Sequence, residues 1–286
     1  NMRTGGDDIA QALALLGVQP VWDPNSRRVT GFDIMPLAVL ERPRVDVTLR
    51  CSGFFRDAFP AQIQLMDKAI RAVACLDEPA DMNPLAAAVM QTTARLIEKG
   101  LSEVDAKSRA SLRIFSAKPG AYGAGLQTLI DEGIWDRKSD FANTFISWSS
   151  YGYGDGHAGT EAVDMLTDRL GAADGVIHNQ DNREHDILDS DDYYQFIGGL
   201  SASIEAIKGQ SVPIYHNDHS NPERPVIRAL SNDNTQYIMH YARQDLLWLK
   251  YHLKVKPKNI FCTKVASKIA RTASSYHGYK DLVKEL

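Results

Sequence analysis

The chain has 286 residues, of which 44% are hydrophobic and 24% charged, and its formal net charge is −4. This length suits one large domain or two ordinary ones, and the composition is that of a globular protein rather than a disordered or fibrous one. No apolar run approaches the roughly 20 residues of a membrane-spanning helix, so we expect no membrane contact. The N-terminal residues contain no signal-peptide core, and we expect a cytoplasmic location.

The charge is distributed unevenly along the chain. Residues 230–286 carry ten Lys and Arg against four Asp and Glu, a balance of +6, whereas residues 1–229 carry 22 against 32, a balance of −10. Eight of the ten basic residues after residue 229 are lysines, but sixteen of the 22 before it are arginines. This double change indicates two segments of different origin. Cys51, Cys75 and Cys262 lie far apart, which indicates reduced thiols rather than a zinc site or disulfides.

Periodicity and capping signals predict alternating helices and strands, and therefore a mixed α/β fold. The predicted helices cover residues 7–16, 54–76, 85–98, 102–110, 126–132, 139–148, 161–170 and 192–208. Thr4 or Asp7 is expected to cap the first helix and Thr160 the seventh. The predicted strands cover residues 28–36, 45–49, 112–115, 175–177 and 212–215, and residues 151–157 are expected to form a flexible polar loop.

Metal- and proton-competent side chains are most concentrated in residues 178–196, which begin with His178. A second cluster of histidines and acids occupies residues 215–224. Each cluster follows a predicted strand, and ligands of α/β sheets gather where strands end, so the pattern favours one site built from two loops. The alternative is an acidic helix start and an ordinary polar loop, because acidic residues are common in first turns.

Residues 116–125 form a glycine-rich loop between a predicted strand and a predicted helix. Such a loop can hold an anion at a helix N-terminus. The loop is followed by no Gly-Lys-Ser/Thr and does not have the GxGxxG spacing, so the pattern favours an ordinary turn between strand and helix.

Several stretches resemble the large subunit of the ATP-dependent cobaltochelatase, namely residues 4–8, 46–57, 120–125, 178–196 and 216–225. The related magnesium chelatase large subunit shares the Ser-Gly-x-Phe-Arg-Asp element at 52–57 but fits 178–196 less well, which favours cobalt and the corrin pathway. The resemblance covers residues 1–227. It implies an internal fragment of a much longer chelatase subunit, which on its own is expected to be inactive.

The resemblance also implies a substrate, a substrate metal and partners. The substrate would be a tetrapyrrole, a corrin precursor of cobalamin, and the substrate metal Co²⁺. ATP and Mg²⁺ would act only through partner subunits, which are AAA+ ATPases. The whole enzyme would be a metal chelatase, a ligase that forms nitrogen–metal bonds.

Metal insertion requires a ring N–H to lose its proton and a hydrated cation to lose its waters, and imidazole and carboxylate suit both tasks. Imidazole also suits Co²⁺ better than oxygen-only ligands do. The expected catalytic residues are His178, His185, Asp181 and Glu184. The expected metal ligands are His216, His219 and Asp218. Arg183 and Arg224 are expected to bind substrate carboxylates or to pair with these acids. For any single histidine a structural role is an equal alternative, and Arg56-Asp57 is expected to be an internal ion pair.

Residues 228–286 instead resemble a ribonuclease D-like 3′–5′ exonuclease of the DEDD type. The matching stretches are 240–246, 261–267, 270–272 and 277–282, with a strand expected at 236–239 and helices at 243–253 and 263–271. Asp245 matches a metal ligand of that family, but the upstream Asp-x-Glu and downstream Tyr-x-x-x-Asp elements are missing. Two-metal hydrolysis needs several carboxylates, so only weak nucleic-acid binding is expected of this small α/β tail. Three hypotheses remain: a chelatase fragment, an exonuclease fragment, or a chimeric chain with neither activity.

Overall fold

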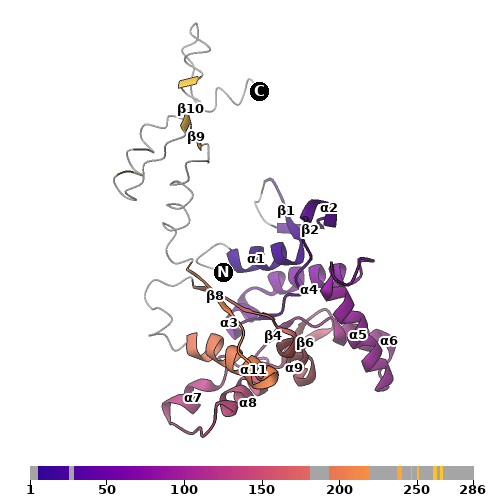
Figure 1. Ribbon diagram of the computed structural model, residues 1–286, viewed down its shortest axis with the longest axis vertical. Helices are drawn as coiled ribbons and strands as arrows, with labels where there is room; N and C mark the ends of the chain where they lie inside the picture. Colours follow the sequence, from indigo (N-terminus) through magenta and orange to yellow (C-terminus); the bar gives the residue numbers. More distant parts are fainter. Residues whose placement is uncertain are drawn as a thin grey trace. The chain divides into compact units, whose positions relative to one another are not determined.

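The computed structural model divides the chain into two compact units, residues 1–218 and 219–286 (Figure 1). The residues that the structure describes are 6–25, 29–180, 193–218, 237–239, 246, 250, 260–262 and 265–266. No helix among these residues is long and apolar enough to cross a bilayer. As expected, the fold of the first unit is mixed α/β.

The first unit begins with helix α1 (Asp7–Leu16), whose predicted bounds are confirmed. Its N-cap is Gly6 rather than Thr4 or Asp7, because the chain enters the helix with a φ of 107°, which favours glycine. Gly17 ends the helix in the left-handed region, as predicted. The chain then forms an antiparallel hairpin of β1 (Val18–Trp22) and β2 (Val29–Ile34).

Helices follow as α2 (Leu37–Leu40), α3 (Gly53–Ala58), α4 (Pro60–Ala74), α5 (Pro84–Glu98) and α6 (Glu103–Ala110). The single helix predicted for residues 54–76 is wrong, since Phe59 leaves helical geometry and Pro60 begins a new helix. The side chains of Asn83 and Ser102 cap α5 and α6 at their predicted starts.

A four-stranded sheet has the order β3-β4-β5-β6. Strands β3 (Leu49–Arg50) and β4 (Ile114–Ser116) are parallel, and β5 (Tyr151–Gly154) and β6 (His157–Glu161) continue the sheet antiparallel. The strand predicted for 45–49 is thus only two residues long and shifted. The flexible loop predicted for 151–157 is wrong, because Tyr153 is buried and its hydroxyl donates to the Ala117 carbonyl at 2.6 Å.

The second half of the unit contains the remaining helices and a two-stranded parallel sheet. The helices are α7 (Leu126–Asp131), α8 (Lys138–Ser149), α9 (Val163–Ala172), the π-helix η1 (Tyr194–Gly198) and α11 (Gly199–Lys208). Helices α8, α9 and α11 pack together beside β4 (Figure 1). Thr160 lies in β6 and does not cap α9, whose N-cap is Ala162. The small sheet pairs β7 (Val176–Gln180) with β8 (Ile214–Asp218).

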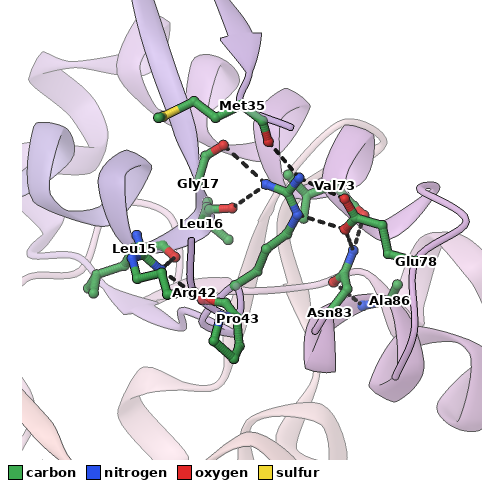
Figure 2. Close-up of polar contacts among 11 residues, drawn as sticks. Leu15, Leu16, Gly17, Met35, Arg42, Pro43, Val73, Glu78, Asn83 and Ala86 are labelled. Atoms are coloured by element: carbon green, nitrogen blue, oxygen red, sulfur yellow. Dashed lines mark hydrogen bonds and ion pairs between the residues drawn. The ribbon is translucent and has the colours of Figure 1, made fainter. Parts of the chain in front are cut away.

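A continuous hydrophobic core joins α1, α4, α5, β4 and α9, with fully buried Leu13, Met66, Ile70 and Phe115. Buried arginines hold the surrounding segments together. Figure 2 shows the tightest case, in which Arg44 donates to the carbonyls of Leu16, Gly17 and Met35 and to both oxygens of Glu78.

In the second unit, β9 (Tyr237–Met239) and β10 (Ile260–Cys262) form a parallel pair. The strand expected at 236–239 is confirmed at 237–239. Most residues of the two helices expected in the tail, 243–253 and 263–271, lie outside the described residues.

Candidate functional site

Strands β7 and β8 bring the two histidine clusters together. Their parallel register places His178 directly beside His216. The two rings stack with centroids 5.2 Å apart and planes 20° apart. The structure thus brings one histidine of each predicted cluster together, while the prediction that the clusters form one site stays a prediction. Both lie inside strands rather than in the loops that follow, because β7 extends two residues beyond His178.

The His216 ring is oriented by a neighbour on the adjoining strand. Its Nε2 lies 3.0 Å from Oε1 of Gln180. An amide oxygen only accepts hydrogen bonds, so with Oε1 of Gln180 in this position Nε2 is the donor, and in the neutral ring Nδ1 is then the nitrogen with the lone pair. A neighbour that fixes the tautomer in this way determines which nitrogen is available to a metal or a proton.

The middle of the ladder is fastened to the N-terminal helix. The Asn179 amide donates to Asp8 Oδ1 at 2.6 Å and to Gln11 Oε1 at 2.8 Å, both on α1. Asn217 in turn donates to Asn179 Oδ1 at 2.9 Å. These bonds hold β7 and β8 against α1 and thereby limit the movement of the adjacent histidines.

Most of the predicted site residues lie outside the described part of the chain. These are Asp181, Arg183, Glu184, His185, His219, Arg224 and Asp245. Asp218 ends β8, and nothing is described of its side chain. Within the described ranges, no three His, Cys, Asp or Glu side chains form a metal-holding group. The metal-ligand assignments for these residues therefore stay predictions.

Residues 193–196 contact both the histidine pair and a second group of residues that includes Gln127 and Arg50. Tyr193 packs edge-on against His178, with centroids 4.8 Å apart and planes 82° apart. In the π-helix that follows, Gln195 donates to Gln127 Oε1 at 2.7 Å, so it attaches η1 to α7. The Phe196 ring stacks on the guanidinium of Arg50, which lies 4.4 Å from its centroid. Short π-helices occur frequently at functional sites.

Arg50 is a candidate site residue that the sequence analysis missed. It ends β3, beside the glycine-rich loop, where its Nη2 donates to the Gly123 carbonyl at 2.7 Å and its Nε to Ser149 Oγ at 3.3 Å. Burial is the main reason why the pKa of Arg50 is lowered to about 10; nearby Cys51 opposes this shift and Arg56 adds to it. Among the described residues no carboxylate pairs with Arg50. A single arginine in a short strand gives no periodic signal, so no sequence pattern could have singled it out.

Arg56 and Asp57 form the predicted ion pair, but only Arg56 is internal, because the Asp57 side chain is 47% exposed. Arg56 Nε and Nη2 donate to the two Asp57 oxygens at 2.7 and 2.8 Å. The hydrogen bond to Asp57 raises the pKa of Arg56, and the hydrogen bond from Arg56 lowers the pKa of Asp57. Arg56 Nη1 also donates to the carbonyls of Ala117 and Lys118. The pair therefore fixes the start of the glycine-rich loop.

The glycine-rich loop turns several carbonyl oxygens, rather than amide groups, toward charged side chains. Its carbonyls at residues 117, 118, 121 and 123 all accept from arginines. The helix that follows, α7, has only six residues. These contacts favour the ordinary turn over an anion site built from the loop's own amides.

Comparisons with known proteins identify the family. The family described as CobN/Magnesium Chelatase matches residues 1–241. The chain belongs to this family. It is 59% identical over 233 residues to the aerobic cobaltochelatase subunit CobN of Sinorhizobium sp, a match that covers 82% of this chain and 18% of that protein. The catalytic subunit of cobaltochelatase from Mycobacterium tuberculosis has a similar structure, with a TM-score of 0.69, 46% identity, and coverage of 75% of this chain and 18% of that one.

A third relative bears on the tail. An uncharacterized protein of Methanocaldococcus jannaschii is 41% identical over 279 residues, which cover 98% of this chain and 21% of that protein. This match and the family match both continue past the boundary expected near residue 228. The chain spans about a fifth of the length of these three relatives. Nothing in these comparisons shows an exonuclease relative, so the fusion stays a prediction.

Described residues from the stretches that carry the resemblance contact one another in the structure although the stretches lie far apart in the sequence. Asp8 of the first stretch contacts Asn179, and His178 stacks on His216 of the last. Arg50 contacts both Gly123 of the glycine-rich loop and Phe196. All five stretches that carried the resemblance thus contribute residues to two adjoining groups of contacts, which η1 connects.

Proposed function

We propose that this chain is part of the tetrapyrrole-binding large subunit of an ATP-dependent cobaltochelatase, which inserts Co²⁺ into a corrin precursor during cobalamin biosynthesis. AAA+ ATPase partner subunits would supply ATP hydrolysis with Mg²⁺. The observation that carries the proposal is the parallel β7–β8 ladder, which places His178 beside His216 in a chain that is 59% identical to a CobN subunit.

The geometry of the pair favours different tasks for the two histidines. The lone pairs of imidazole lie in the ring plane, and these two planes are nearly parallel at 20°. One ion cannot lie in both planes at bonding distance when the rings stack face to face, so we assign Co²⁺ to one ring of the stacked pair only. In its neutral form His216 has a lone pair on Nδ1, and we propose that this nitrogen coordinates Co²⁺. His178, packed between His216 and Tyr193, is proposed to accept a pyrrole proton.

The remaining predicted residues complete this proposal. Asp181, Glu184 and His185 would assist proton removal, and Asp218 and His219 would hold the metal with His216. Arg183 and Arg224 would bind substrate carboxylates. All of them follow or adjoin β7 or β8 in the sequence, which is why they are proposed together with the histidine pair.

Cobalt insertion by the complete chelatase, assembled with its ATPase subunits, tests the assignment. His178→Ala is expected to slow insertion by about 100-fold or more, the usual contribution of a general base. Insertion is followed by the absorbance of the corrin, and a thermal melt verifies folding. Arg109→Met, which removes a surface partner of Asp164, serves as the control. Wild-type rates in both His178→Ala and His216→Ala would remove the pair from the mechanism.

For residues 228–286 the alternatives are an exonuclease fragment and a chimeric segment without activity. The archaeal relative that matches 98% of the chain favours continuous family sequence through this segment. Incubation of the chain with labelled single-stranded RNA and Mn²⁺ separates these possibilities. Metal-dependent trimming of the 3′ end would support the exonuclease alternative, and intact RNA would count against it.

A further inference from the structure

Arg50 is partly buried, and it differs from the fully buried arginines of the unit in what surrounds it. Arg44, Arg56 and Arg113 each donate through Nε to a carboxylate, Glu78, Asp57 and Asp46 respectively, at 2.6 to 2.7 Å. Arg50 instead donates to a carbonyl and a hydroxyl and lies against two phenylalanine rings. A charge removed from water is stabilised by a partner of opposite charge, and the described residues give Arg50 none.

Its guanidinium also has unused donors. Of the five N–H groups, one on Nη2 is directed to Gly123 and the one on Nε to Ser149. Nη1 has no hydrogen-bond partner among the described residues. It nevertheless remains accessible to solvent, whereas Nη1 of Arg169 is buried without a hydrogen bond. The edge formed by Nη1 and Nη2 is therefore available, and it is one of the two edges of a guanidinium that can bind a carboxylate through two parallel bonds.

The position of this edge is fixed. Phe196 stacks on one face of the guanidinium, and Gly123 and Ser149 hold its other edge. An Arg that is already immobilised loses little conformational entropy when it binds a ligand. The cationic centre is thus prepared for an anion that the described chain does not supply.

We propose that Arg50 is a carboxylate-binding residue for the substrate, whose anionic side chain bonds to Nη1 and Nη2 at the carboxyl end of β3. The proposal rests on the proposed function, since a corrin precursor is a ring with several carboxylate side chains. It adds a recognition residue to Arg183 and Arg224 on a different element of the fold.

The surroundings suit a ligand that carries a large flat ring. Three aromatic side chains adjoin the same loop or the helix α7 that follows it, and all three are partly exposed. Tyr122 belongs to the loop, Trp148 packs against Gly125, and the Tyr194 hydroxyl donates to Gln127 at 3.1 Å. Aromatic faces stack on flat conjugated ligands, and a fixed charge beside them selects those that carry a carboxylate.

Two corrinoid probes test the proposal with the complete 286-residue chain. One is a metal-free corrin with free carboxylates, and the other is the same corrin with all carboxylates converted to methyl esters. Dissociation constants come from quenching of tryptophan fluorescence. The wild-type chain is expected to bind the acid more tightly than the ester. Arg50→Met is expected to weaken acid binding by roughly 10- to 100-fold, the range for a charged hydrogen bond, and to leave ester binding unchanged.

Two further variants separate recognition from a folding effect. Arg50→Lys keeps the charge but not the two-bond edge, so its affinity for the acid is expected to lie between those of wild type and Arg50→Met. Arg109→Met is expected to bind both probes as wild type does. Equal affinity of wild type and Arg50→Met for the acid would overturn the role of Arg50 while leaving the chelatase assignment intact. Failure of the wild-type chain to bind either probe would count against both proposals.

Discussion

The Arg44–Glu78 pair gives the sharpest prediction about stability (Figure 2). Arg44 is only 2% exposed, and Glu78 accepts two of its hydrogen bonds at 2.7 and 2.8 Å. Glu78 also accepts from Asn83, whose side chain caps α5. Glu78→Gln removes the counter-charge and points an amide N–H at groups that only donate. Breaking one side of a buried pair costs about 3–5 kcal/mol, so we expect the free energy of unfolding to fall by about that amount.

Urea unfolding at pH 7, followed by far-UV circular dichroism, measures this loss. Asp164→Asn is the matched control, because it makes the same chemical change in the surface pair with Arg109. Its expected cost is under about 1 kcal/mol, as is usual for surface pairs. Equal losses in the two variants would refute the reasoning, since burial would then have no effect on the value of the pair.

The pH dependence provides a second measurement on the same variant. The hydrogen bonds from Arg44 lower the pKa of Glu78 in the folded chain. The stabilisation is therefore complete above the ordinary pKa of a glutamate and is lost as the pH falls through the lower folded pKa. Glu78→Gln cannot titrate, so the stability difference from wild type is expected to shrink below about pH 4.3. A difference that stays constant in acid would contradict the ion-pair explanation.

Two further predictions concern a thiol and a turn. Burial raises the pKa of Cys51 to about 12, so at pH 8 only about one Cys51 thiol in ten thousand is ionised. Because the thiolate is the reactive form, mass spectrometry should find exposed Cys75 alkylated long before Cys51. Similar alkylation rates would contradict this. Gly154 has a φ of 147° and a Cβ there would overlap the Asp67 carboxylate, whereas Gly156 has open space. Gly154→Ala should therefore lower the urea midpoint more than Gly156→Ala, and equal shifts would refute the steric argument.

The sequence predicted helices better than strands, for a physical reason. Helix α5 begins at Pro84 after a capping Asn83, and these local signals act within a few residues of each other. The β5–β6 hairpin begins Tyr-Gly-Tyr-Gly, which is typical of a loop. It forms a strand because Tyr153 reaches Ala117, 36 residues away. Pairing of that kind depends on tertiary contacts that no local pattern records.

The sequence predicted the candidate site only in part, namely where two neighbouring strands bring their residues to the same edge of a sheet. The sequence predicted that His178 and His216 each lie near a strand end. The parallel register of β7 and β8 then places the two histidines side by side. Arg50 was not predictable in this way. Its distinguishing property is the missing carboxylate partner among the described residues, which is a feature of its surroundings and not of its sequence neighbours.

The turn that contains Tyr193 and Phe196 connects the two parts of the candidate site. Residues three apart on a helical turn lie on the same side, and here one ring contacts His178 while the other covers Arg50. The contact of Gln195 with Gln127 fastens the same turn to α7. The proposed proton acceptor and the proposed carboxylate-binding residue are therefore positioned by a single packed turn. A substrate whose carboxylate is held at Arg50 would have the orientation of its ring set relative to His178 by the same turn.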